Sequence, residues 1–286
     1  MKNFELSRQE KQESKKEFHF KEILEIESAM VSLVKQLKEK IKDKEYDTLI
    51  SDDVGGRIPT LILKKIIKQV NPDQKLETFF VASGKTYLPT FENEEKYAKL
   101  QEYLKKMTGK TKKALIITQF IFSGDTMIKL IDALRESGIN NFDIASVDAM
   151  PYPEKKEMLM EKLGENKLYI GSEDFHSFHE KHEKFGGLGK SKEYSPIPKK
   201  MKNIIAESGR KFSFEELDKI LGIEENDSPQ IINEKLKNPQ NVEKLETERF
   251  KPLSEAEKNK IQQNINFARE DVDLLSTMVV KDVWGK

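Results

Sequence analysis

Residues 113–130 read KALIITQFIFSGDTMIKL, and this stretch decides the predicted fold. It opens with an apolar run at 114–117, typical of a strand buried on both faces of a parallel sheet. Apolar residues return at helical spacing from Met127. A turn at a helix N-terminus offers backbone N–H groups and the positive end of the helix dipole to an anion. We therefore expect a strand, a helix and, between them, a phosphate-sized loop made of Ser123, Gly124, Asp125 and Thr126.

A second candidate anion loop lies earlier in the chain. Residues 46–51 predict a short strand, and an apolar helical pattern runs onward from Pro59. Between them, Gly55 and Gly56 permit close backbone approach, and Arg57 brings a planar cation to the start of the helix. The segment is interpreted either as an anion-binding loop or as a tight strand-to-helix turn with an exposed arginine.

Two aspartates directly precede these glycines. Asp52 and Asp53 are candidate oxygen ligands for Mg²⁺, which prefers carboxylate oxygens. The alternative is an aspartate pair that caps the following helix.

Strands and helices alternate through the middle of the chain. Further strands are expected at residues 76–82, 142–147 and 167–171, and further helices at residues 18–44, 94–107 and 153–163. This alternation predicts an α/β fold with a doubly wound, mostly parallel sheet and helices on both faces. Ligands of such sheets bind beyond the carboxyl ends of the strands, where both candidate loops begin.

Composition restricts the class of protein. Acidic and basic residues number 50 each, so the net charge does not indicate a nucleic-acid partner. The absence of cysteine excludes disulfides, thiol catalysis and cysteine-bound zinc. No apolar run reaches the length of a membrane span, and the N-terminus has no signal-peptide pattern, so we expect a soluble, cytoplasmic protein without a membrane partner.

Three regions follow from the patterning. Residues 1–17 are highly charged and predict a flexible N-terminal arm. Residues 18–198 hold the α/β domain. Residues 199–286 predict a helical C-terminal appendage that ends in a long helix and packs on the core or on a second subunit, which leaves a homodimer open.

The loop at residues 172–198 is unusual in composition. It contains three of the chain's four histidines, namely His176, His179 and His182. They are candidate ligands for a transition metal, although a spacing of three residues spreads them around a helix. Two alternatives remain open: a surface loop that packs its aromatic side chains on the body, or a cover over the site in which Phe175 or Phe178 stacks on a base.

The segment at residues 113–130 resembles the PRPP-binding motif of the type I phosphoribosyltransferases. Ser123, Gly124 and Thr126 match the loop that binds the 5′-phosphate in that family. The chain departs from the family at Thr118 and Gln119, which stand at the ribose positions where the family has two acidic residues. Replacing a carboxylate by a neutral group weakens a charge-assisted hydrogen bond to a sugar hydroxyl.

The resemblance extends over roughly residues 44–175 and assigns roles to other positions. It implies a diphosphate loop at Asp53, Gly55, Gly56 and Arg57, a mobile loop carrying Lys85 and Tyr87, and base stacking by Phe175 or Phe178. It implies a protein of nucleotide metabolism that binds PRPP or a related phosphorylated ribose ligand, with Mg²⁺ as a candidate cofactor. Such a protein is either a pentosyltransferase that transfers ribose 5-phosphate to a nitrogenous acceptor or a non-catalytic regulatory or ligand-binding protein that retains the fold.

Overall fold

A computed structural model of the chain describes residues 18–52, 56–81, 94–121, 124–149, 153–173, 214–224, 226–250 and 255–285. The chain divides into two compact units. One unit comprises Met1–Tyr194 and Asn266–Lys286, and the other comprises Ser195–Ile265.

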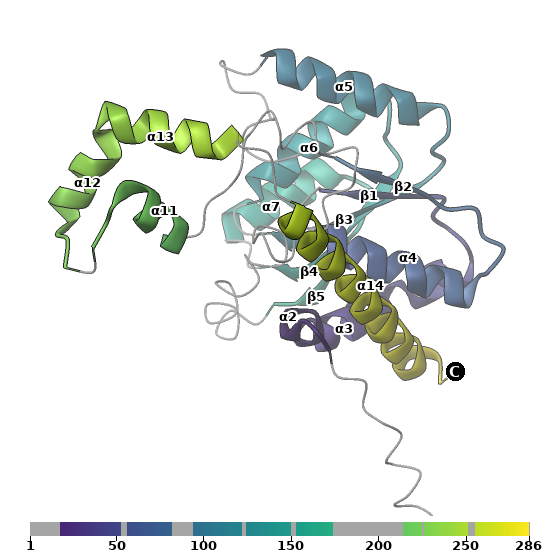
Figure 1. Cartoon of the computed structure of the whole chain (residues 1–286). Helices are drawn as coiled ribbons and strands as arrows, with labels where there is room; N and C mark the ends of the chain where they lie inside the picture. Colours follow the sequence, from purple (N-terminus) through teal and green to yellow (C-terminus); the bar gives the residue numbers. More distant parts are fainter. Residues whose placement is uncertain are drawn as a thin grey trace, which may run out of the picture. The chain divides into compact units, whose positions relative to one another are not determined.

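The first unit is built on a parallel sheet of five strands in the order β2-β1-β3-β4-β5 (Figure 1). The strands are β1 (Thr48–Ser51), β2 (Glu77–Phe80), β3 (Ala114–Ile121), β4 (Phe142–Ala149) and β5 (Leu168–Ser172). β3 and β4 are buried almost throughout, as their apolar sequences require for a sheet covered on both faces. The predicted α/β class with a parallel sheet is confirmed.

Helices cover both faces because strand side chains alternate between them. On one face, Leu49, Leu115 and Ile117 pack with α3 (Glu27–Lys42), α4 (Arg57–Val70) and part of α14 (Glu255–Trp284). On the other, Ile50 and Ile116 pack with α5 (Glu94–Thr108), α6 (Asp125–Glu136) and α7 (Pro153–Leu163). This arrangement is compatible with a doubly wound fold.

Three element boundaries differ from the sequence prediction. The helix predicted at 18–44 is two helices, α2 (Lys21–Glu25) and α3, because the fully buried Ile26 leaves the helical conformation between them. α4 begins before Pro59, since proline is tolerated in the first turn of a helix. β3 continues to Ile121, so Thr118 and Gln119 are strand residues.

The last helix contributes to the sheet-containing unit. Along residues 266–284 of α14, Val272, Leu275 and Val279 are buried in the same core as α3 and α4. Asp271 accepts hydrogen bonds from the backbone N–H groups of His19 (3.0 Å) and Phe20 (2.8 Å), at the start of α2. The appendage predicted for residues 199–286 is thus divided, because residues 266–286 group with the sheet.

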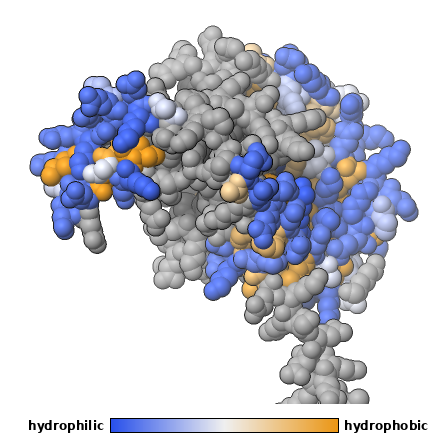
Figure 2. Space-filling view, viewed as in Figure 1, coloured by the Kyte–Doolittle hydropathy of each residue, from blue (hydrophilic) through white to orange (hydrophobic). Residues whose placement is uncertain are grey.

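The second unit is helical. It contains α11 (Phe214–Leu221), α12 (Pro229–Lys237) and α13 (Pro239–Phe250). As expected, Ser228 caps α12 by accepting a hydrogen bond from the N–H of Ile231. The face in Figure 2 is predominantly hydrophilic over the described residues. Within these residues no helix combines the length and hydrophobicity needed to cross a membrane.

Candidate functional site

The strand order produces a topological switch point between β1 and β3, which opens at the carboxyl edge of the sheet. After β1 the chain adds β2 on one side and then returns to place β3 on the other. Open α/β sheets bind ligands at such a switch point, beyond the carboxyl ends of the two central strands. α4 follows β1 and α6 follows β3, so the N-termini of both helices lie at this edge.

Each of these helices begins at a glycine. Gly56 is the N-cap of α4 and Gly124 is the N-cap of α6, and neither helix has a side-chain hydrogen bond at its cap. Gly124 has φ of 77°, a left-handed conformation that favours glycine. The first N–H groups of a helix have no partner within the helix, so these two turns can donate to an anion. Asp125, which is exposed, and Thr126, which is partly exposed, form the first turn of α6.

Gly56 lies very close to β1 and β3. A Cβ atom at this position would be 2.3 Å from the carbonyl oxygen of Ile117 and 2.4 Å from Oδ1 of Asp52. No side chain fits there without a shift of the backbone. The close approach predicted for this glycine therefore occurs, and its partners are the two strand ends.

Arg57 is 7% exposed, unlike the exposed arginine of the simple-turn interpretation. Its guanidinium carbon lies 4.2 Å from the ring centroid of Phe80, at the end of β2. This is a cation–π contact, which holds the guanidinium in a fixed position beside the first turn of α4.

The two residues predicted at ribose positions are both buried, Thr118 at 1% and Gln119 at 7% exposure. The Thr118 hydroxyl donates a 2.5 Å hydrogen bond to Oδ2 of Asp52. Asp52 is partly exposed, and its backbone N–H donates to the carbonyl of Ile117 at 3.2 Å.

Two polar residues on β4 join this edge, although neither was predicted from the sequence. Ser146 pairs with Thr118 and so extends the polar row from Asp52 across the sheet, while Asp148 pairs with Phe120 nearer the strand ends. Ser146 Oγ donates to the carbonyl of Asp148 at 2.6 Å, and Asp148 Oδ1 accepts from the N–H of Ala149 at 2.9 Å. Both side chains are buried. The sequence signal that could have identified these two residues is their polarity within an otherwise apolar strand.

Several predicted site residues lie outside the described residues. These are Asp53, Gly55, Lys85, Tyr87, Ser123, Phe175, Phe178, His176, His179 and His182. Over the part of the chain that the structure describes, no group of three or more His, Asp or Glu side chains is placed to hold a metal ion.

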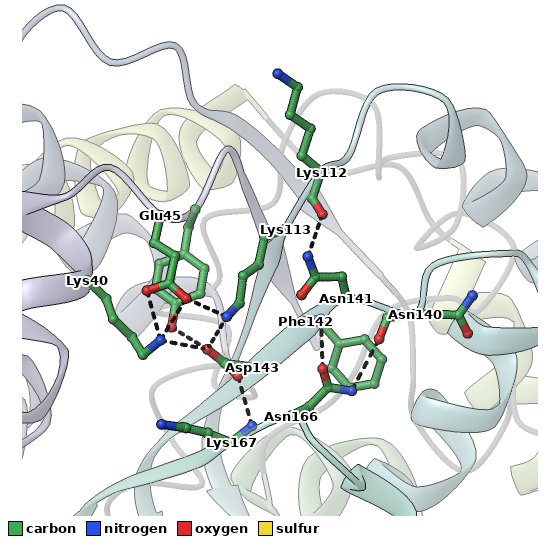
Figure 3. Close-up of polar contacts among 11 residues, drawn as sticks. Lys40, Glu45, Lys112, Lys113, Asn140, Asn141, Phe142, Asp143, Asn166 and Lys167 are labelled. Carbon is green, nitrogen blue, oxygen red and sulfur yellow. Dashed lines mark hydrogen bonds and ion pairs between the residues drawn. The ribbon is translucent and has the colours of Figure 1, made fainter.

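The opposite, amino edge of the sheet holds a charged cluster that was likewise not predicted (Figure 3). Asp143, 1% exposed, accepts hydrogen bonds from Tyr46 Oη (2.6 Å) and the Lys167 N–H (2.8 Å) and pairs with Lys113 Nζ (3.1 Å). Glu45 pairs with Lys113 (2.5 Å) and with Lys40 (2.7 Å).

These contacts set the pKa values of the cluster. Burial alone raises the pKa of Asp143, but hydrogen bonds from Tyr46, the Lys167 backbone and Lys113 outweigh it and leave this pKa below its usual value. Burial also raises the pKa of Glu45, and the bonds from Lys113 and Lys40 likewise reverse the effect. Burial and the bond to Asp143 both raise the pKa of Tyr46. The lowered pKa values keep Asp143 and Glu45 ionised at neutral pH, and the raised pKa keeps Tyr46 protonated as a donor.

Comparison with known proteins finds no matching family model, no matching curated protein and no matching solved structure.

Proposed function

We propose that the chain is a phosphoribosyltransferase-like protein that binds PRPP or a related phosphorylated ribose ligand at the carboxyl edge between β1 and β3. One observation carries the proposal. Two adjacent parallel strands are each followed by a helix that begins at a glycine, without a side-chain cap, beside their switch point. Two sets of helix N–H groups at one edge suit a ligand with two phosphorylated ends.

The helix after β3 takes the 5′-phosphate in this proposal. The N–H groups that follow Gly124 and the hydroxyl of Thr126 are the donors there. The helix after β1 takes the diphosphate, with Gly56 and Arg57 beside it. Because Mg²⁺ is often held by one or two carboxylates together with substrate phosphates, Asp52 is compatible with a metal carried in by the ligand.

The proposed reaction transfers ribose 5-phosphate from PRPP to a nitrogenous acceptor and releases diphosphate. The chain's contribution is to position the ligand and to stabilise charge on the leaving diphosphate with backbone N–H groups and the Arg57 cation. No nucleophilic side chain is required.

A second candidate is a non-catalytic regulatory or ligand-binding protein with the same fold. The observation that favours it is the burial of Thr118 and Gln119, at 1% and 7% exposure, where the family has two acidic residues. Neutral, enclosed side chains at these positions give up charge-assisted hydrogen bonds to the ribose.

The test is calorimetric titration with PRPP and Mg²⁺, followed by an assay for diphosphate released when a panel of nitrogenous bases is added. Thr126→Ala should weaken PRPP binding, whereas Thr277→Ala, at an exposed position of α14, should not. Binding with base-dependent release identifies a transferase, and binding without release identifies the non-catalytic protein. Absence of binding overturns the proposal.

A further inference from the structure

An open cavity of about 480 Å³ lies where α6 and α7 end, at the opposite end of α6 from Gly124. Binding sites for small molecules occupy roughly 300–1,000 Å³, so the cavity has the size of such a site. Its lining is polar with one exception, the leucine at the end of α7. The lining residues are Arg135 on α6, Leu163 on α7, and Asn140, Asn141, Glu165 and Asn166 in the loops that follow these helices.

Arg135 is the cation of this cavity, and its neighbours hold it in place. Its Nη2 donates to the Leu163 carbonyl at 3.2 Å, and its guanidinium carbon lies 6.0 Å from the ring centroid of the buried Phe142. Arg135 is partly exposed, and no carboxylate of the described residues forms an ion pair with it. A guanidinium has five N–H donors in a planar fork, and a carboxylate accepts two of them in parallel. Arg135 therefore suits a carboxylate of a ligand.

The opposite charge comes from Glu165 and from the helix ends. Glu165 is exposed, lines the same cavity, and forms no ion pair with a lysine or arginine in the part of the chain that the structure describes. The C-terminal ends of α6 and α7 add partial negative charge, because the last carbonyls of a helix carry the negative end of its dipole. A lone anion would meet this negative charge, and a lone cation would meet Arg135. A ligand that carries both charges is attracted by both.

The asparagines fix the loops and still present polar atoms to the cavity. Asn166 joins the two loops, because its Oδ1 accepts from the Phe142 N–H at 3.3 Å and its Nδ2 donates to the Asn140 carbonyl at 3.2 Å (Figure 3). Asn141 Nδ2 donates to the Lys112 carbonyl at 2.9 Å, which leaves its Oδ1 as an acceptor. Asn140 is exposed, and its side-chain amide makes none of the bonds drawn in Figure 3. The amides of Asn140 and Asn141 suit a polar, uncharged group.

We infer that this cavity binds a small zwitterion of the free amino acid class, with Arg135 on its carboxylate and Glu165 on its ammonium. Asn140 and Asn141 then face the ligand's side chain, for which a polar, uncharged group is the best match. A peptide end carries one of the two charges and so leaves Arg135 or Glu165 without a partner. The inference goes beyond the proposed function and is independent of it, because no residue of the proposed PRPP position lines the cavity.

The experiment titrates the full chain with L-asparagine and with two analogues that each lack one charge. Succinamate lacks the ammonium, and β-alaninamide lacks the carboxylate. Loss of a charge-assisted hydrogen bond corresponds to about a tenfold or greater loss of affinity, so both analogues should bind at least about tenfold more weakly than L-asparagine. Ligand-observed NMR measures these affinities in the millimolar range.

Two substitutions assign each charge to its residue. Arg135→Gln should weaken L-asparagine and succinamate about tenfold or more and leave β-alaninamide unchanged. Glu165→Gln should weaken L-asparagine and β-alaninamide and leave succinamate unchanged. Arg269→Gln, at an exposed position of α14, is the control for loss of a positive charge and should bind all three like the wild type. Because Glu165 is exposed, Glu165→Gln decides the question if Arg135→Gln does not fold.

Three results would overturn the inference. They are absence of saturable binding of L-asparagine, L-glutamine and L-serine at millimolar concentrations, equal affinity for L-asparagine and succinamate, and unchanged L-asparagine affinity in folded Arg135→Gln or Glu165→Gln. The second result would mean that the cavity accepts a carboxylate alone. PRPP binding is measured in a separate titration, so each proposal can fail while the other survives.

Discussion

The two edges of the sheet use their carboxylates differently. At the amino edge, Asp143 is 1% exposed and is bound by the Tyr46 hydroxyl, the Lys113 ammonium and the Lys167 N–H. At the carboxyl edge, Asp52 is partly exposed and is held by the neutral hydroxyl of Thr118. The first carboxylate has its charge balanced by lysine and its oxygens enclosed by protein. The amino edge therefore encloses its carboxylate in a charged cluster, while the carboxyl edge, where the proposed ligand would bind, holds its carboxylate beside the start of α4.

The largest effect is expected from Asp143→Asn. The substitution leaves Lys113 and Lys40 with Glu45 as the remaining acid of the cluster, and removing one partner of a buried ion pair costs about 3–5 kcal/mol. Urea denaturation would measure the loss.

Asp132→Asn is the control for this substitution. Asp132 pairs with Lys162 at 2.9 Å, with side chains 39% and 46% exposed, so less than about 1 kcal/mol should be lost. Equal losses in the two variants would mean that the buried cluster contributes no more to stability than a surface ion pair.

Tyr46→Phe tests the same edge by its pH dependence. Loss of a hydrogen bond to a charged group should cost roughly 1.5–3 kcal/mol at neutral pH. The pKa of Tyr46 is raised above its usual 10.0. The contribution of Tyr46 to wild-type stability should therefore be fully present below pH 10.0 and should be lost as the pH rises further. The pKa values of Asp143 and Glu45 are lowered, so stability is present above the usual carboxyl pKa and is lost as the pH falls through the lowered values.

Urea midpoints measured across the pH range would separate these contributions. Tyr46→Phe should lack the alkaline loss that Tyr46 causes in the wild type. It should also begin its acid loss at a higher pH, because Asp143 has lost a donor that lowers its pKa. A pH profile identical in shape to the wild type would contradict the assigned role of Tyr46.

The alternation of strands and helices could be predicted because it depends on the spacing of apolar residues that are close together in the sequence. The apolar stripe of α6 has helical spacing, and the apolar run at 114–117 has the short length and continuous burial of a strand covered on both faces. The end of β3 could not be predicted in this way. Thr118 and Gln119 are polar and precede a glycine turn, yet they lie within β3, where Thr118 and Phe120 both pair with β4.

Contacts between distant residues were the other part that local patterns could not supply. Thr118 and Asp52 are 66 residues apart, and Tyr46 and Asp143 are 97 apart. Only the strand order brings each pair together. Asp143 did carry a signal, since a charged residue in the strand sequence FDIASV requires a buried partner, but the sequence does not identify that partner.

Gly56→Ala tests how tightly the carboxyl edge is assembled. The added Cβ would meet the Ile117 carbonyl at 2.3 Å, and forcing extra atoms into a packed site costs about 1–3 kcal/mol. Gly109→Ala is the control, because a Cβ there meets nothing within 4 Å. Thermal denaturation should show a lower midpoint for Gly56→Ala than for Gly109→Ala. Equal midpoints would mean that the two strand ends and α4 can separate freely.

The smallest effect on stability is expected from Arg57→Lys, and this substitution sharpens the comparison between the edges. The guanidinium stacks on Phe80 at 4.2 Å, and exchanging it for an ammonium keeps the charge but loses the planar stack. We expect a loss of about 0.5–1 kcal/mol, the strength of a modest cation–π contact, by urea denaturation. PRPP affinity should fall more than stability, because lysine cannot present the fixed fork of donors that a diphosphate accepts. If stability fell by several kcal/mol while PRPP affinity stayed unchanged, Arg57 would be a structural cation like Lys113, and the contrast between a stabilising edge and a binding edge would fail at this residue.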